Sequence, residues 1–235
     1  LFGGIGLVIV IAIVLLLVLG GGNGKNQTGG NGKNQPDAIT AIQQAKEYSN
    51  KLSASERNVL GIRKDGTVVC AGYYGDSLDS EVSYWDGDII AVDNNNNNIF
   101  GLCKDGSVRV AGEIYPAWKL AIAEWTDIVA LTATHDILVG IKKDGTVVSV
   151  GNNRAFTTGI KDWSDIVDAD ASENSIVGLK KDGTVVYAGI IYSGASVMKE
   201  WTDIVAISHG RQHTVGLKKD GTVVAAGRGD YGQLR

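Results

Sequence analysis

The side chains that most often do chemistry are scarce in this sequence. It contains three histidines, His135, His209 and His213, and two cysteines, Cys70 and Cys103. His209 and His213 have a spacing that would pair them on a helix, but they flank a predicted turn between strands, and no cysteine or carboxylate cluster completes a metal site. The cysteines lack C-x-x-C spacing. We therefore predict that the chain binds no metal and no cofactor and that its histidines are structural. The two cysteines are expected to be free or buried thiols, and the alternative is a disulfide between neighbouring repeats.

The carboxylates do not suggest an active site either. Five aspartates each precede a glycine in one recurring motif, which predicts turns rather than general acids. These predicted structural turns are Asp65–Gly66, Asp105–Gly106, Asp144–Gly145, Asp182–Gly183 and Asp220–Gly221. The glutamates do not pair by spacing, as the two carboxyl groups of a glycosidase must. No glycine-rich loop opens a helix to bind phosphate. We expect that the chain is not an enzyme.

Composition narrows the class of partner. The 235 residues include 32 glycines and only 2 prolines, which suggests many tight turns. The net charge is −4 and the isoelectric point about 5.4. Nucleic-acid binding rests largely on lysine and arginine at phosphates, so an acidic chain is not expected to bind nucleic acid.

A repeat determines the predicted fold. Five segments share one pattern, as in VGLKKDGTVVYAG at 177–189, and their aspartates are 40, 39, 38 and 38 residues apart. Tryptophans at 85, 125, 163 and 201 precede an Asp-Ile pair at nearly the same spacing, with one extra residue, Gly87, in the first copy. Asp-Gly between apolar alternations predicts a hairpin, through either a two-residue turn or a three-residue turn with a glycine bulge. A mid-strand glycine, such as Gly140, fits close approach of a neighbouring sheet.

Each unit is expected to supply several strands and no helix. The hairpin gives two strands, WTDIVAI a third, and the segment at 190–200 or its equivalents a fourth. Units of about 38–40 residues built this way predict an all-β fold, a β-propeller of four-stranded blades, because stacking around an axis covers both faces of each blade.

The last unit resembles a regulator of chromosome condensation repeat. The pattern at 203–234 carries that family's histidine before the hairpin, His213, and its Tyr-Gly-Gln-Leu after it, beginning at Tyr231. The resemblance covers roughly residues 53–235 and weakens where Asn94–Asn98 replaces the glycine and histidine. It implies a seven-bladed ring, of which four or five blades are visible. We therefore expect the propeller at 53–235 to be incomplete at its C-terminus.

The N-terminal part has a different character. Residues 1–20 are uncharged and apolar, long enough for a transmembrane helix, with a cleaved signal peptide as the alternative. Residues 21–36 repeat GGNGKNQ and are expected to form a flexible linker. Residues 37–52 are expected to form a short amphipathic helix on the edge of the propeller. The chain is thus predicted to be a single-pass membrane protein with an extracytoplasmic propeller.

Partner specificity is expected in the segments that vary between units, at 73–84, 113–124, 152–162 and 190–200. They fall at one point of every unit and should cluster on one face. Aromatic and arginine side chains anchor protein interfaces. The predicted anchors on this partner face are Tyr73, Tyr74, Tyr115, Trp118, Arg154, Phe156 and Tyr192. The alternative is that they pack beneath the segments.

These observations favour a membrane-anchored, non-catalytic protein-binding module whose partner is unidentified. The resemblance implies the same class, since related propellers are protein-binding platforms. The alternative that it implies is guanine-nucleotide exchange on a small GTPase. That activity depends on a feature projecting from the propeller, and the visible units have no insertion.

Overall fold

The computed structural model describes residues 51–72, 75–95, 97–152, 159–173, 175–191, 194–230 and 232–234. The predicted transmembrane helix at 1–20 and linker at 21–36 lie outside these residues. So does the predicted helix at 37–52, apart from its last two positions; Leu52 begins a strand, so a helix cannot extend to it. No helix within the described ranges is long and apolar enough to cross a bilayer.

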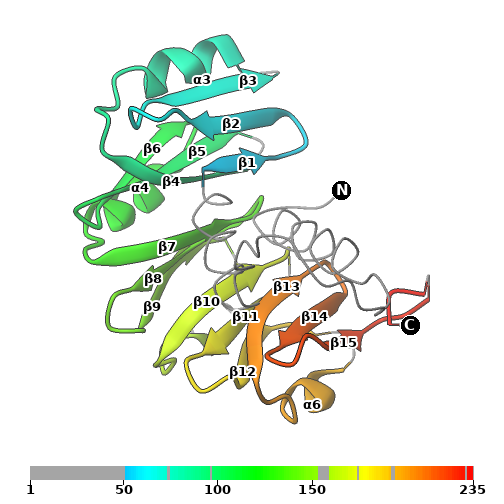
Figure 1. The fold of residues 1–235 in the computed structure, drawn as a ribbon. Helices are drawn as coiled ribbons and strands as arrows, with labels where there is room; N and C mark the ends of the chain where they lie inside the picture. Colours follow the sequence, from blue (N-terminus) through cyan, green and yellow to red (C-terminus); the bar gives the residue numbers. More distant parts are fainter. Residues whose placement is uncertain are drawn as a thin grey trace, which may run out of the picture.

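The described residues form five antiparallel three-stranded sheets in sequence order. Sheet 1 is β1 (Leu52–Ala54), β2 (Asn58–Ile62) and β3 (Val68–Gly72), and sheet 2 is β4 (Ile89–Asn94), β5 (Asn98–Cys103) and β6 (Val108–Gly112). Sheet 3 is β7 (Ile128–Ala133), β8 (Ile137–Lys142) and β9 (Val147–Gly151), and sheet 4 is β10 (Ile166–Ala171), β11 (Ser175–Lys180) and β12 (Val185–Gly189). Sheet 5 is β13 (Ile204–His209), β14 (His213–Lys218) and β15 (Val223–Gly227). The sheets follow one another along an open arc, with sheets 1 and 5 at its ends (Figure 1).

The expected fourth strand is wrong for the described part of the chain. Short helices take its place: α3 (Gly75–Val82), α4 (Pro116–Ala123) and α6 (Ala195–Met198). Each lies against the outermost strands of two consecutive sheets, as α4 does against β6 and β9. Each also buries an apolar residue, Val82, Ile122 or Met198, between those sheets. A helix can therefore close the gap at the outer edge that a fourth strand was expected to fill.

The Asp-Gly turns have the three-residue form. In sheet 3 the Gly145 amide donates to Lys142, and the Lys142 amide donates to Thr146, so three residues lie between the paired ends. Gly145 has φ +82°, while Asp144 stays outside the left-handed region. The Asp144 carboxylate accepts from the Thr146 amide at 2.9 Å and from its hydroxyl at 2.6 Å. These bonds hold the pKa of Asp144 below its ordinary value.

All five turns repeat this geometry. The glycines at 66, 106, 145, 183 and 221 have φ between +82° and +87°. Each aspartate accepts from the amide and hydroxyl of the Thr or Ser two residues on. The turns also link sheets, because the carbonyl of Gly106 accepts from the Ile128 amide of sheet 3 at 3.0 Å. Gly145 and Gly183 bond to the next sheet in the same way.

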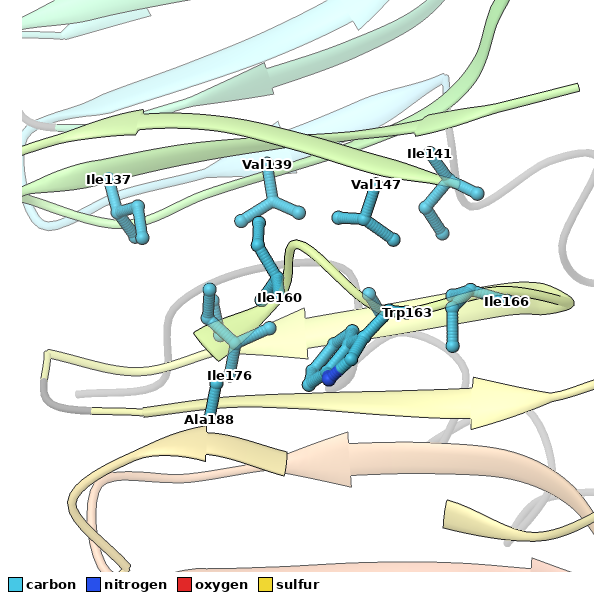
Figure 2. Close-up of a cluster of buried hydrophobic side chains, with 11 residues drawn as sticks. Ile137, Val139, Ile141, Val147, Ile160, Trp163, Ile166, Ile176 and Ala188 are labelled. Carbon is cyan, nitrogen blue, oxygen red and sulfur yellow. The ribbon is translucent and has the colours of Figure 1, made fainter. Parts of the chain in front are cut away.

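The hydrophobic core lies between neighbouring sheets rather than in one centre. Figure 2 shows the cluster between sheets 3 and 4, where Val139 and Val147 face Trp163 and Ile176. Equivalent clusters fill the three other interfaces. Each sheet is therefore stabilised mainly by its neighbours, as in other repeat proteins.

In sheets 2 to 5 the mid-strand glycines make room for the tryptophan of their own unit, not for a neighbouring sheet, whereas Gly61 of sheet 1 lies against Leu52. A Cβ placed on Gly140 would lie 3.0 Å from Cζ3 of Trp125, and one on Gly101 would lie 2.4 Å from Cζ3 of Trp85. Trp125 packs flat over the middle strand and is 8% exposed. Any residue larger than glycine at this position of the middle strand would therefore clash with the tryptophan ring.

The two ends of the arc leave apolar faces uncovered. The equivalent position of the middle strand holds Ile99 in sheet 2, Leu138 in sheet 3 and Ile176 in sheet 4. All three side chains are completely buried against the preceding sheet. The same position in sheet 1 is Val59, which is 53% exposed. At the other end Val223 of β15 is also exposed.

Candidate functional site

The structure describes two of the seven predicted partner-binding residues. Tyr115 precedes α4 and Trp118 lies in its first turn. The other five lie outside the described residues: Tyr73, Tyr74, Arg154, Phe156 and Tyr192.

The variable segment at 113–124 crosses the outer rim instead of staying on one face. It starts after Gly112, which pairs with Asn98 at the end of the sheet opposite the Asp-Gly turn. It ends shortly before Ile128, whose amide bonds to the turn glycine Gly106 at the other end. This differs from the expected clustering on one face, because the segment must return the chain to the start of the next inner strand.

Helix α4 shows an unusually apolar surface on this rim. Leu120 is 72% exposed and Tyr115 is 61% exposed, next to exposed Pro116 and Ala117. Trp118 is half-buried against the cluster between sheets 2 and 3, and its ring centre is 5.7 Å from that of Tyr115. Among the described side chains of α3, by contrast, the exposed ones are Asp79, Ser80 and Glu81.

A second group of candidate residues is polar and buried. Asp93 of β4 is 1% exposed, and its carboxyl group contacts three consecutive sheets. Its Oδ1 lies 2.8 Å from the Ser53 hydroxyl oxygen of sheet 1 and accepts from the backbone amide of Asn94 at 2.8 Å, and its Oδ2 accepts from the Ala133 amide of sheet 3 at 2.8 Å. Burial raises the pKa of Asp93 to about 6, against the opposing effect of these bonds.

Asp170 holds the equivalent position in sheet 4. It accepts from the amides of Ala171 at 2.9 Å and His209 at 2.8 Å, the latter in sheet 5. Burial, with smaller effects from Asp168 and Asp93, raises the pKa of Asp170 to about 7.

His209 and Ser175 form the only pair among the described residues that resembles a nucleophile with its base. Their Nε2 and Oγ are 2.6 Å apart, with Ser172 Oγ 3.1 Å from the same nitrogen and Thr214 Oγ1 2.8 Å from Nδ1. Burial and, to a lesser degree, His213 lower the pKa of His209 to about 4, which makes it a weak base at neutral pH. The adjoining pocket has an interior volume of about 10 Å³, room for about one water molecule. This group is therefore suited to joining sheets 4 and 5.

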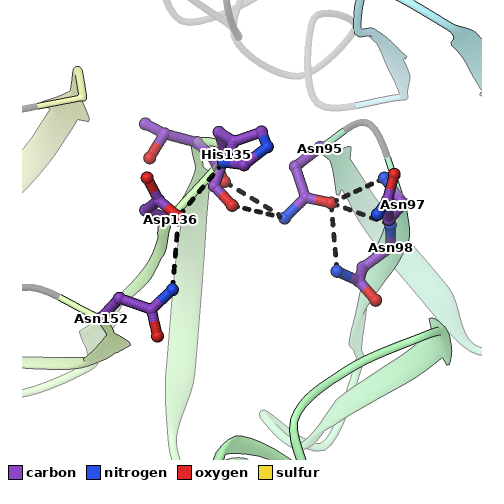
Figure 3. Close-up of polar contacts among 7 residues, drawn as sticks. Asn95, Asn97, Asn98, His135, Asp136 and Asn152 are labelled. Atoms are coloured by element: carbon purple, nitrogen blue, oxygen red, sulfur yellow. Dashed lines mark hydrogen bonds and ion pairs between the residues drawn. The ribbon is translucent and has the colours of Figure 1, made fainter.

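A further polar contact joins sheets 2 and 3 (Figure 3). The Asn95 amide group donates to the carbonyls of Thr134 at 3.2 Å and His135 at 3.5 Å. Its oxygen accepts from the amides of Asn97 and Asn98. This is the segment where asparagines replace the family's glycine and histidine, and they supply a different link between the sheets.

The described residues contain no group of three or more His, Cys, Asp or Glu side chains placed to hold a metal ion. Cys70 and Cys103 are free thiols, so the alternative of a disulfide between repeats is wrong. Burial raises the pKa of the Cys70 thiol.

Sequence reasoning missed Asp93, Asp170, Ser175 and Ser53. A signal was present: in IIAVDN and DIVDADA an aspartate stands where the other units place Thr132 or Ser208. A charge in a strand that is buried on both faces needs a partner, and that requirement could have marked both positions.

Residues 204–233 match the model of the regulator of chromosome condensation (RCC1) repeat. They comprise β13, β14 and β15, the three-stranded unit that the four earlier sheets repeat. The last sheet therefore matches one RCC1 repeat, and the earlier sheets share its three-stranded architecture. Comparison with curated proteins gives no significant sequence match.

Solved structures show the same propeller fold. Prp20p from Saccharomyces cerevisiae matches with a TM-score of 0.56 at 14% identity, over 76% of this chain and 57% of that one. Human WBSCR16 matches with a TM-score of 0.59 at 14% identity, over 78% of this chain and 62% of that one. The CRINKLY ectodomain of the Arabidopsis thaliana receptor kinase ACR4 matches with a TM-score of 0.53 at 18% identity, over 75% of this chain and 64% of that one. The chain thus spans less than two thirds of the length of each of these proteins.

Proposed function

We propose that this RCC1-repeat chain is a non-catalytic protein-binding module held at a membrane by residues 1–20, with its propeller on the extracytoplasmic side. The observation that carries the binding role is the apolar surface of α4. Leu120 and Tyr115 project from the rim although the helix needs only Ile122 and part of Trp118 to pack on sheets 2 and 3.

The remaining predicted anchors complete the proposed surface. Tyr73, Tyr74, Arg154, Phe156 and Tyr192 lie in the equivalent variable segments of other units, so they would extend the surface around the rim. Exposed aromatic and aliphatic side chains on a rigid scaffold provide binding energy at little cost in conformational entropy. The geometry of His209 and Ser175 supports the non-catalytic part of the proposal, because the pocket beside them, as the described residues form it, has room for about one water molecule.

The experiment compares the rim helix α4 with a position away from the rim. Partners captured by the full chain are measured with Leu120→Glu and with Val167→Glu, which places the same charge at an exposed apolar position of the inner strand β10, outside the variable segments. We expect Leu120→Glu to lower affinity at least about thirtyfold, the effect of losing a binding hot spot of about 2 kcal/mol. Val167→Glu should bind as the wild type does, with the same thermal stability in all three proteins. Equal binding by all three would refute the α4 surface.

Nucleotide exchange is tested in the same series. Prp20p is described as binding Gsp1p and histones, so protein partners are included, together with a small GTPase as the alternative that the resemblance implies. Faster release of guanine nucleotide in the presence of this chain would replace the non-catalytic role.

Membrane attachment is tested separately. Retention in membranes washed at high salt would support an uncleaved anchor, since about 20 apolar residues can span the hydrocarbon core. Recovery of a mature protein that begins after Gly20 would show a signal peptide instead.

A further inference from the structure

We propose that the carboxyl group of Asp93 carries a proton in the folded chain, and that this proton completes a hydrogen-bonded link between sheets 1 and 2 that is lost as the pH rises. The proposal concerns the coupling of sheets and is independent of what the rim binds.

The argument starts from the number of protons available at Ser53. Its Oγ lies 2.8 Å from Oδ1 of Asp93 and 2.7 Å from Oδ1 of Asn94. Both separations are typical of O–H···O hydrogen bonds. A serine hydroxyl has one proton and can donate to only one of the two oxygens. The second contact therefore needs a proton from elsewhere.

The amide of Asn94 does not supply it. Its Nδ2 donates to the Asn58 carbonyl at 3.3 Å and to Ser55 Oγ at 3.1 Å, so its oxygen faces Ser53. Turning the amide over would leave its oxygen opposite the Asn58 carbonyl. It would also make an N–H···O bond of 2.7 Å to Ser53, at the short limit for that type.

A proton on Asp93 satisfies all three groups. Asp93 then donates through Oδ1 to Ser53 Oγ, and Ser53 donates to Asn94 Oδ1. The backbone amide of Asn94 still donates to Oδ1 of Asp93, and Oδ2 of Asp93 still accepts from the backbone amide of Ala133 at 2.8 Å. Sheet 1 is then joined to sheet 2 by a continuous chain of donors and acceptors.

The surroundings favour the neutral acid. From β1 the group facing Asp93 is the Ser53 hydroxyl, from β7 it is the Ala133 amide, and the cross-strand partner on β5 is Phe100, which is completely buried. None of these carries a charge. The charged group that interacts with Asp93 electrostatically is Asp170 on β10, a second acid. Burial without a cation disfavours the carboxylate, in line with the raised pKa of about 6.

Sheet 1 is where loss of this proton should have its effect. Its inner strand β1 is only 3 residues long, and its outer face leaves Leu52 and Val59 more than half exposed. Deprotonation places a buried charge at the interface and leaves two acceptors for the one Ser53 proton. Sheet 1 should then separate from sheet 2 more often than any other sheet from its neighbour.

Asp170 offers a matched control. It also lies between sheets and is buried, but its carboxyl oxygens accept from two backbone amides and face no competing acceptor. The geometry at Asp170 therefore does not require a proton.

The test uses the full chain and the variants Asp93→Asn and Asp170→Asn. Burial also raises the pKa of Asp170, to about 7, so both carboxyl groups contribute to the protonated-carboxyl infrared band of the wild type at pH 5, and Asp170→Asn isolates the contribution of Asp93. In Asp170→Asn the band should be present at pH 5 and disappear near pH 6, and it should be absent from the double variant that also carries Asp93→Asn. Amide hydrogen-exchange protection of β1 should fall between pH 5 and pH 7 in the wild type and stay level in Asp93→Asn. A raised pKa of an acid stabilises the folded state at low pH, so the wild-type unfolding constant should rise roughly 100-fold, relative to Asp93→Asn, between pH 4 and pH 7.

Absence of the band from Asp170→Asn at pH 5, or its persistence in the double variant, would overturn the proposal. If Asp93→Asn does not fold, Ser53→Ala provides the second measurement, because it interrupts the chain at its middle. The drop in β1 protection near pH 6 should then vanish. An unchanged drop in Ser53→Ala would equally refute the link.

Discussion

The exposed end of the arc allows one side-chain position to be tested in two environments. Leu138 in sheet 3 and Val59 in sheet 1 occupy the same position of the middle strand, but Leu138 is completely buried and Val59 is 53% exposed. Truncating Leu138 to alanine removes apolar atoms from the packed interface between sheets 2 and 3 and leaves a cavity. Such Leu→Ala changes cost about 2–5 kcal/mol. Val59→Ala removes two methyl groups that are already largely in contact with water, so the expected cost is about 0.5 kcal/mol or less.

The assay is urea unfolding of the full chain, followed by circular dichroism, for the wild type and both variants at one pH. We expect the midpoint to fall clearly for Leu138→Ala and to stay close to the wild type for Val59→Ala. Ile99→Ala should behave like Leu138→Ala, since Ile99 is also completely buried. Equal losses for Val59→Ala and Leu138→Ala would refute the reasoning, because they would mean that the outer face of sheet 1 is covered in solution.

Three further predictions follow from single contacts. Trp118→Ala should lower the free energy of unfolding by about 2 kcal/mol because the ring is half-buried between sheets, whereas thermal unfolding of Tyr115→Ala should match the wild type. Gly221→Ala should lower the free energy of unfolding by about 1 kcal/mol because alanine is strained at φ +87°. Gly106→Ala should lower it distinctly more, since the new Cβ would also lie 2.9 Å from Cα of Asp127, next to the following sheet, and the urea midpoints of the two variants test this difference. The pKa of His209 is lowered from 6.5 to about 4, so its stabilising effect is complete above pH 6.5 and is lost as the pH falls toward 4; His209→Gln should show a smaller drop in melting temperature over that range.

The repeat was predictable because its signals are local. The Asp-Gly turn needs positive φ at one residue only, and the aspartate and the following Thr or Ser supply bonds within three residues. The fourth strand was not predictable from the same kind of signal. The segment PAWKLAIA has no strict helical stripe of buried residues, since only Ile122 is buried, and its helix depends on the gap between β6 and β9.

The buried polar contacts were hidden for a related reason. Ser53, Asp93 and Ala133 are separated by 40 residues at each step, and they meet only because consecutive sheets stack in register. Local sequence shows that Asp93 lies in a strand, but not which groups from two other sheets surround it. The role proposed for Asp93 therefore depends on the stacking as much as on the residue itself.

The distribution of stabilising contacts explains how the rim of the propeller can vary in sequence. The apolar clusters, the stacked tryptophans and the Gly-to-Ile hydrogen bonds all lie between sheets, at positions that nearly every unit shares. The two rim helices attach to this scaffold in different ways: Asp79 and Glu81 of α3 accept from the backbone amides of Cys70 and Gly112, whereas α4 packs through Ile122 and part of Trp118. Leu120, which is 72% exposed, gains little burial from the described residues, and this is the observation on which the proposed partner surface rests.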